Sequence, residues 1–148
     1  MAPLFALLIG FALTRLTGVL GVDAVDSNQT ALRVGLALMF LLTGLAHFGL
    51  GRRAGLIAMV PPGLPRPDLL VTFTGVLELV GAAGLLFPAT ARAAGACLAL
   101  LMLAMFPANV FAARRGVPLG GRPPMPLLPR TVLQVVFVSA AAAVAFSL

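Results

Sequence analysis

The stretch 69-LLVTFTGVLELVGAAGLLF-87 decides the fold of this chain. It is nineteen residues long and carries one ionisable side chain, Glu78, which is the only glutamate in the sequence. An apolar run of this length predicts a helix that crosses a lipid bilayer. Because a bare carboxylate at the centre of a bilayer costs at least ~2.5 kcal/mol, Glu78 is expected to be protonated, paired or turned toward a polar cavity, and never toward lipid.

The composition extends this prediction to the whole protein. Of the 148 residues, 61% are hydrophobic and only 9% are charged, and the mean hydropathy is +1.11. A soluble domain of this size would carry about 25% charged residues, so lipid must cover most of the surface here. Continuous apolar runs, in place of the alternating pattern of barrel strands, predict an all-α membrane bundle. The length suits a single domain covering residues 1–148.

Five segments are long and apolar enough to span the membrane. We place these helices at residues 3–20, 31–50, 69–87, 92–113 and 130–148. The first lacks the basic start of a signal peptide and is therefore kept as a mature helix. Thr30 could cap the second helix, and residues 89–91 are expected to form a tight turn between the third and fourth. Four prolines within residues 61–67 forbid a continuous helix there, and the short apolar piece 54–60 is expected to lie in the interface or re-enter the membrane.

Arginine placement predicts the orientation. The net charge of +6 comes from ten arginines and no lysine. Seven of them flank the two longer loops: Arg52, Arg53, Arg66, Arg114, Arg115, Arg122 and Arg130. The positive-inside rule places these loops in the cytoplasm, with the N-terminus inside and the C-terminus outside. Arginines at the ends of apolar runs indicate topology and contact with anionic headgroups rather than nucleic-acid binding.

Two stripes of small residues recur at four-residue spacing. They comprise Gly10, Thr14 and Gly18 in the first segment and Ala91, Gly95 and Ala99 in the fourth. Small residues let helix backbones approach closely in membranes. The stripes are compatible both with packing inside the bundle and with a homo-oligomer.

Polar side chains occur at similar depths on several predicted helices. His47, Asn109 and Gln134 each lie three or four residues from the inner end of their segment, about 4 to 6 Å inside the same boundary. Glu78 lies deeper, at about 14 Å. Polar groups in lipid seek one another or a wet cavity. We therefore predict one pocket open toward the arginine-rich side and lined by His47, Glu78, Asn109, Gln134, Thr43 and Thr74.

Plainer roles exist for the same residues. Asn109 and Gln134 could serve as hydrogen-bonding glue between helices, and His47 could be an interfacial residue that donates to a neighbouring carbonyl. Glu78 could be a protonated structural group bonded to a backbone carbonyl or to Asn109, or it could handle protons or polarise a ligand. A His/Glu pair on two helices without a spaced motif does not predict a metal site.

The sequence contains no catalytic motif. No GxSxG, Walker loop, HExxH or dinucleotide fingerprint is present, so no catalytic residue is assigned and an enzyme is not favoured. Cys97 is the only cysteine, which excludes an internal disulfide and a CxxC pair. It is expected to be a small packing residue within its helix.

Several short motifs resemble those of the DoxX-like family of small bacterial membrane proteins. They are ALRVGLALMFLLTGLAHF (31–48), MVPPGLPRPD (59–68), TGVLELVGAAGLLFPATARAAG (74–95), FPANV (106–110) and LPRTVLQVV (128–136). The resemblance implies a four-helix core, to which residues 3–20 add an N-terminal helix. It also implies that His47, Glu78, Asn109 and Gln134 occupy the family's recurrent polar positions. The cysteine pairs of some redox relatives are missing here.

Three functions are compatible with these features. The first is a non-catalytic DoxX-like membrane protein that binds a small hydrophobic ligand, such as a quinone or lipid, or acts as the membrane partner of a redox complex. The second is a small proton-coupled transporter, although no internal inverted repeat of the kind many transporters use is evident. The third is a membrane subunit of a quinone-linked oxidoreductase whose redox centre lies on another polypeptide.

Overall fold

The computed structural model describes residues 1–49 and 51–147, and the regular structure in this part of the chain is helical. Five helices in it are long and apolar enough to cross a membrane, which confirms the predicted all-α bundle with five candidate spans. They are α1 (Ala2–Val19), α2 (Asn28–Ala46), α4 (Pro67–Leu86), α5 (Pro88–Arg115) and α6 (Leu127–Phe146). A short helix, α3 (Arg53–Met59), and a 3₁₀ turn, η1 (Asp23–Val25), lie in the connections.

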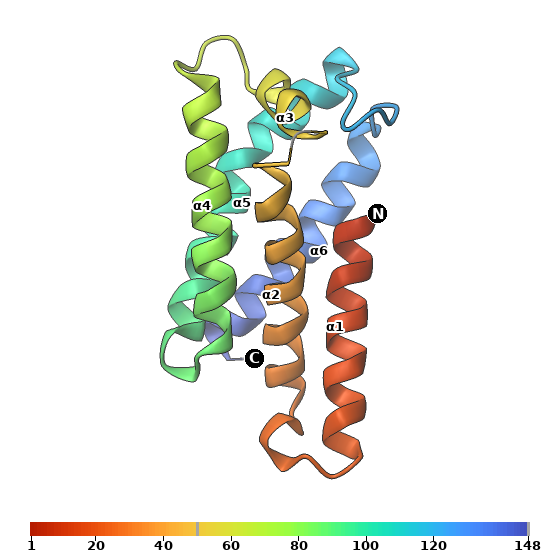
Figure 1. The fold of residues 1–148 in the computed structure, drawn as a ribbon, viewed down its shortest axis with the longest axis vertical. Helices are drawn as coiled ribbons and strands as arrows, with labels where there is room; N and C mark the ends of the chain where they lie inside the picture. Colours follow the sequence, from red (N-terminus) through yellow and green to blue (C-terminus); the bar gives the residue numbers. More distant parts are fainter. Residues whose placement is uncertain (50, 148) are drawn as a thin grey trace.

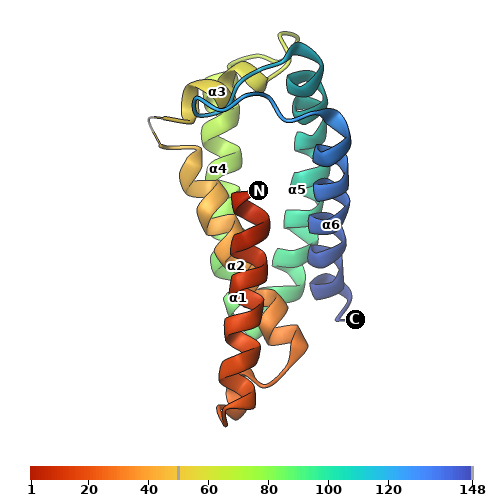
Figure 2. The same ribbon diagram turned by 90° about the vertical axis from the view of Figure 1, so that its right-hand side faces the viewer.

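The five long helices pack mainly in chain order. Each contacts the next, α1 on α2, α2 on α4, α4 on α5 and α5 on α6, and a smaller contact joins α2 to α6 (Figure 1). In the perpendicular view, α1, α2 and α4 lie on one side of the molecule and α5 and α6 on the other (Figure 2). Helix α3 and the loop between α5 and α6 lie across one end of the bundle, called the α3 end below.

Helix boundaries follow capping chemistry and differ in detail from the predicted ones. The α2 helix is capped by Ser27, whose hydroxyl accepts from the backbone N–H of Thr30 at 3.0 Å, so the prediction that Thr30 is the cap is wrong. The α5 helix begins at Pro88, because proline is well suited to the first helical position. Residues 89–91 therefore belong to α5, and the predicted turn there is also wrong. The second helix ends at Ala46, four residues earlier than expected.

The small-residue stripes are used inside the chain. A Cβ on Gly10 would lie 2.9 Å from the Cα of Gly35, and one on Gly35 would lie 2.6 Å from the carbonyl oxygen of Leu7. A Cβ on Gly95 would lie 2.8 Å from the carbonyl oxygen of Ala141 on α6. These glycines let α1 approach α2 and α5 approach α6 to backbone contact.

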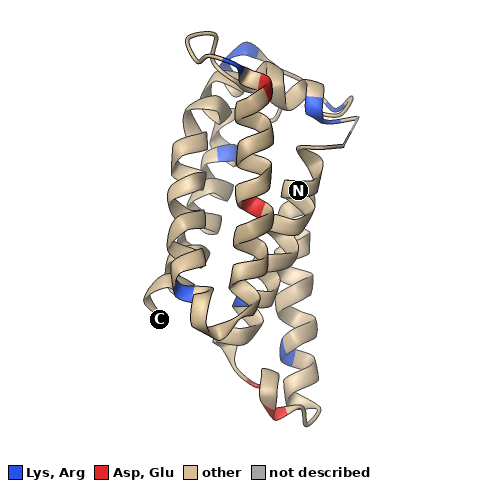
Figure 3. Ribbon diagram, turned by 60° about the vertical axis from the view of Figure 1, so that its left-hand side comes forward, with Lys and Arg blue, Asp and Glu red and all other residues tan. Residues whose placement is uncertain are grey.

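Arginines satisfy carbonyl groups at the ends of neighbouring helices. Arg33 donates to the carbonyl of Leu85 at 2.7 Å and to that of Leu86 at 2.9 Å, at the end of α4. Arg92 reaches the carbonyl of Ala145 near the end of α6 at 3.3 Å. The last carbonyls of a helix lack partners within it and carry partial negative charge, so a guanidinium there stabilises the end. Most charged residues gather near the two ends of the bundle, and one acidic position lies between them (Figure 3). Glu78 itself is near the middle of α4.

Cys97 differs from its prediction. Its side chain is exposed on the outer surface of α5, not packed in the interior. The interior of the bundle is instead formed by larger apolar residues, of which Phe40, Leu36, Met39, Leu85, Leu98 and Val144 are the most deeply buried.

Candidate functional site

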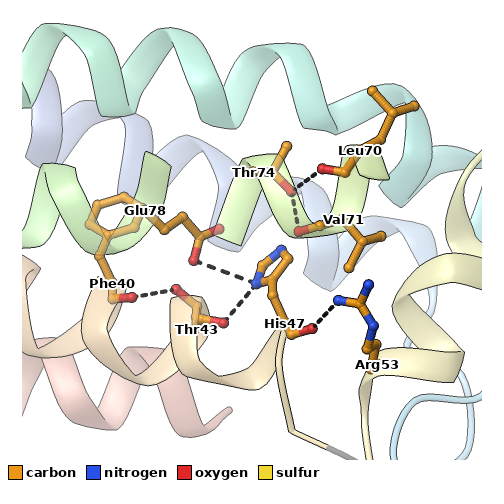
Figure 4. Close-up of polar contacts among 8 residues, drawn as sticks. All are labelled: Phe40, Thr43, His47, Arg53, Leu70, Val71, Thr74 and Glu78. Atoms are coloured by element: carbon orange, nitrogen blue, oxygen red, sulfur yellow. Dashed lines mark hydrogen bonds and ion pairs between the residues drawn. The ribbon is translucent and has the colours of Figure 1, made fainter. Parts of the chain in front are cut away.

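The described part of the chain contains two buried polar or charged side chains, and they face each other. Glu78 on α4 is 3% exposed, and His47, the residue that follows α2, is 7% exposed. The Nδ1 atom of His47 lies 4.0 Å from Oε2 of Glu78 (Figure 4). That distance is too long for a hydrogen bond but close enough for charge on one group to act on the other.

A backbone contact fixes the imidazole of His47. Its Nδ1 lies 2.9 Å from the carbonyl oxygen of Thr43, one helical turn earlier. A carbonyl only accepts, so Nδ1 carries the hydrogen, and in the neutral ring Nε2 remains an acceptor. His47 lies just beyond the candidate span, and burial lowers the pKa of its imidazole below the ordinary value. The bond to Thr43 opposes this shift, whereas the charge of Arg53 adds to it.

Glu78 carries an oxygen atom with no partner. Its Oε2 is buried and has no hydrogen-bond partner among the described residues. Leaving a buried acceptor unsatisfied costs about 1–3 kcal/mol, so such atoms are rare in folded proteins. A protonated carboxyl would lower that cost, and so would a ligand that donates a hydrogen bond. Gln29, at the start of α2, carries a second such atom, Oε1, whereas that of Glu78 lies near the middle of α4.

Two glycines bring the pair together across α2 and α4. A Cβ on Gly75 would lie 2.6 Å from the Cβ of His47, and one on Gly44 would lie 3.3 Å from the Cβ of Glu78. Gly75 thus makes room for His47, whereas Gly44 makes room first for Leu79, at 2.8 Å, and then for Glu78. The sequence carries this arrangement as two matching pentapeptides, TGLAH (43–47) and TGVLE (74–78), on antiparallel helices. Their shared Thr-Gly-x-x spacing is a signal from which the pairing could have been predicted.

The six predicted pocket residues fall into two groups. Thr43 and Thr74 lie beside the His47–Glu78 pair (Figure 4). The hydroxyl of Thr74 is directed back to its own helix, 3.0 Å from the carbonyl oxygen of Leu70.

Asn109 and Gln134 form the second group, between α5 and α6. Gln134 donates to the carbonyl of Met102 at 2.8 Å, and Oδ1 of Asn109 accepts from Arg130 at 3.0 Å. Among residues 1–49 and 51–147, no hydrogen bond or ion pair joins this group to Glu78 or His47. Both amides therefore act between neighbouring helices, and a ligand shared by the two groups stays a prediction.

Two arginines that sequence reasoning assigned only to topology take part in these groups. Arg53 on α3 donates to the carbonyl of His47 at 2.9 Å and to the hydroxyl of Thr72 on α4 at 2.9 Å. It thereby ties α3 to the ends of both helices that carry the pair. Arg130 holds Asn109 and also donates to the carbonyl of Met125 at 3.0 Å. Neither contact has a sequence signal beyond the arginine itself.

Two hollows of the described surface are lined by neither His47 nor Glu78. One, of about 550 Å³, borders the last turns of α5, and another, of about 390 Å³, lies beside the end of α2. The described residues contain no group of three or more His, Cys, Asp or Glu side chains arranged to hold a metal ion. The pair alone could hold a small molecule through hydrogen bonds, with Nε2 of His47 and Oε2 of Glu78 as its free polar atoms.

Comparison with known proteins gives one family. No curated protein and no solved structure matches the chain. A family model described as a domain of unknown function (DUF8561) matches residues 36–145, which is well over half of the chain and includes both polar groups. The chain thus belongs to the DUF8561 family.

Proposed function

We propose that this protein is a non-catalytic, DoxX-like multi-pass membrane protein that binds a small hydrophobic molecule with a polar head at the His47–Glu78 pair. The observation that carries the proposal is the buried Oε2 of Glu78, which has no hydrogen-bond partner among the described residues. Evolution of a stable bundle would place an apolar side chain there, because buried polar atoms without partners destabilise a fold. A bound molecule that donates to Oε2 removes that cost.

A quinone or its quinol suits the chemistry of the pair. A quinol hydroxyl can donate to a carboxylate or to Nε2 of His47, and a quinone carbonyl can accept from a protonated carboxyl. The apolar ring and tail would lie among the aliphatic side chains of α2 and α4. A lipid headgroup with hydroxyls offers the same donors, so both ligand classes belong in the test.

The test is to identify what the protein retains. The wild-type protein is purified in mild detergent, extracted with organic solvent and analysed by mass spectrometry for quinones and lipids. We expect a quinone or a specific lipid at near-stoichiometric amount, and its loss in Glu78→Gln and His47→Gln. Cys97→Ser, on the outer surface of α5, is the matched control and should retain the ligand.

A fourth variant separates the two polar groups. Gln134→Leu removes an amide that bonds to Met102 and has no described contact with Glu78. If the ligand is lost only in the variants of the pair, the site is confined to α2 and α4. Loss in Gln134→Leu as well would favour the single, larger pocket expected from the sequence. The proposal is contradicted if the purified wild-type protein retains no ligand and the Glu78→Gln protein gives the same extract.

A second candidate is proton-coupled transport, favoured by the position of Glu78 near the middle of α4, twelfth of its twenty residues. Ionisable residues at such depth mark proton and ion pathways in many transporters. Reconstituted liposomes under a proton gradient provide the test. Uptake of a candidate solute that depends on Glu78 would support transport, and proton flux equal to that of Glu78→Gln liposomes would remove it.

The third candidate is a membrane subunit of a quinone-linked oxidoreductase or of another redox complex. It requires a partner polypeptide that carries the redox centre, because the described residues hold one cysteine and no metal-binding cluster. Gentle extraction from the native membrane, followed by mass spectrometry, would detect this partner.

The proposed membrane is the bacterial cytoplasmic one, with the α3 end inside, because most arginines lie at that end.

A further inference from the structure

The hollow beside the end of α5 is lined by both apolar and cationic side chains. It is open, has a volume of about 550 Å³, and is lined by residues of α5: Phe106, Pro107, Val110, Phe111, Arg114 and Arg115. This volume lies within the usual range for small-molecule sites in proteins. The four apolar residues precede the two arginines along the helix, so the polarity of the lining changes in one direction, from apolar to cationic.

The length of α5 places that change at the membrane surface. Its 28 residues extend about 42 Å, whereas the hydrocarbon core of a bilayer is about 30 Å thick. Arg92, near the start of α5, is exposed and reaches the end of α6, which places it close to the opposite surface. Counting from Arg92, the core ends near Phe111. Arg114 and Arg115 therefore lie at headgroup level, and the apolar lining lies beside the upper acyl chains.

Neither arginine of the hollow is neutralised by an acidic side chain of the described residues, and Arg115 is also positioned by an aromatic ring. The guanidinium of Arg115 lies 5.8 Å from the centre of the Phe111 ring, within the range of a cation–π contact. The ion pairs of the described residues are Arg15–Asp26 and His47–Glu78, so neither arginine of the hollow has an acidic partner there. The negative end of the α5 dipole is equivalent to only about half a charge and cannot balance both.

We propose that this hollow binds an anionic phospholipid of the bilayer, with its phosphate between Arg114 and Arg115 and its glycerol and upper chains against Phe106, Pro107 and Val110. Guanidinium groups bind phosphate oxygens in pairs and more specifically than a point charge does. A zwitterionic lipid carries its own cation and gains less from the two arginines. The second hollow, of about 390 Å³, has a single arginine, Arg52, and lacks this pair.

The test uses the absence of intrinsic fluorophores. The chain has no Trp and no Tyr, so Phe111→Trp introduces the sole strong fluorophore at the hollow and preserves an aromatic ring under Arg115. Phe73→Trp is the matched control. Phe73 lies in the half of α4 nearer the α3 end, its side chain is 61% exposed, and neither of the two hollows includes it. Each protein is reconstituted in phosphatidylcholine bilayers, and quenching by brominated phosphatidylglycerol is compared with quenching by brominated phosphatidylcholine.

We expect a preference for phosphatidylglycerol in the F111W protein and none in the F73W protein. Each arginine near a membrane surface contributes about a fivefold preference for anionic lipid, so the relative binding constant should be at least about fivefold. The double substitution R114Q/R115Q in the F111W protein should abolish it. R66Q/R122Q removes the same charge from the same end of the bundle and should leave it unchanged. R114K/R115K keeps the charge and should retain part of it.

Three results would overturn the proposal. The first is equal quenching by both lipids in the F111W protein. The second is a preference that survives in the R114Q/R115Q variant. The third is an equal preference in the F73W protein that R66Q/R122Q reduces as much as R114Q/R115Q does, because this pattern would show a general surface potential without a site. None of these results bears on ligand binding at the His47–Glu78 pair.

Discussion

Replacement of Arg33 by Gln should destabilise the bundle far more than the same change at Arg15. Both arginines lie toward the end of the bundle opposite α3, so a pure topology signal would treat them alike. In the structure, Arg33 of α2 donates to the last carbonyls of α4, Leu85 and Leu86, at 2.7 and 2.9 Å. Arg15 forms an exposed ion pair with Asp26 at 2.7 Å.

The magnitudes follow from burial. Leu85 is fully buried, so the bond to its carbonyl is worth about 1.5–3 kcal/mol, as expected for a hydrogen bond with a charged donor. The exposed bond to Leu86 and the helix dipole together add about 0.5–1 kcal/mol. We expect Arg33→Gln to lower the free energy of unfolding by about 2–4 kcal/mol. Arg15→Gln should lower it by less than about 1 kcal/mol, because exposed ion pairs contribute little.

The assay is reversible unfolding in mixed micelles with increasing SDS, followed by far-ultraviolet circular dichroism. Arg92→Gln supplies an intermediate case, since its bond to the carbonyl of Ala145 is long, at 3.3 Å, and exposed. Arg33→Lys keeps the charge and loses the second donor, so its effect should fall between those of wild type and Arg33→Gln. If Arg33→Gln and Arg15→Gln differ by less than about 0.5 kcal/mol, the capping argument is refuted and the arginines act through topology alone.

Other predictions concern the interface glycines and Glu78. Gly35→Ala should lower the free energy of unfolding by about 1–2 kcal/mol despite better helix propensity, because its Cβ would lie 2.6 Å from the carbonyl oxygen of Leu7; the same denaturation assay measures it. Gly75→Ala should displace His47, because the new Cβ would lie 2.6 Å from the Cβ of His47, and should therefore reduce ligand retention in the extraction assay. Glu78→Met should leave stability unchanged or raise it by about 1 kcal/mol while ligand retention is lost. A loss of 2 kcal/mol or more would mean that the carboxyl is a structural group.

The helical architecture could be predicted because membrane spans depend on local properties. Each long apolar run must form a helix to satisfy its backbone in lipid, whatever its neighbours are. The inward direction of Glu78 could be predicted as well, because a carboxylate that faces lipid is costly in free energy. Helix ends were predicted less well, because the choice between Ser27 and Thr30 as the cap depends on which residue leaves the helical conformation. The end of α2 before His47 likewise has no strong local marker.

The prediction of a single polar pocket rested on the depth of each polar residue alone. Counting residues along each helix gives the depth of a side chain, and Asn109 and Gln134 do lie in the half of the bundle that contains His47. Depth alone does not give the neighbour that a side chain faces. In the fold, α2 packs on α4 and α5 packs on α6, so His47 lies near Glu78, at 4.0 Å, and Gln134 bonds to the carbonyl of Met102. Rotation about the helix axis and the packing order were the missing quantities.

The interface between α2 and α4 is shaped around the ionisable pair at the expense of packing. Gly44 and Gly75 are each helix-destabilising by about 1 kcal/mol; Gly75 leaves room for His47, and Gly44 leaves room for Leu79 and Glu78. Two apolar residues in place of His47 and Glu78 would fill the same space without an unpartnered oxygen. A bundle selected only for stability has no use for this arrangement, and Arg53 ties α3 to both helices at that place. These costs coincide at the His47–Glu78 pair, and a function that requires polar groups there accounts for them together.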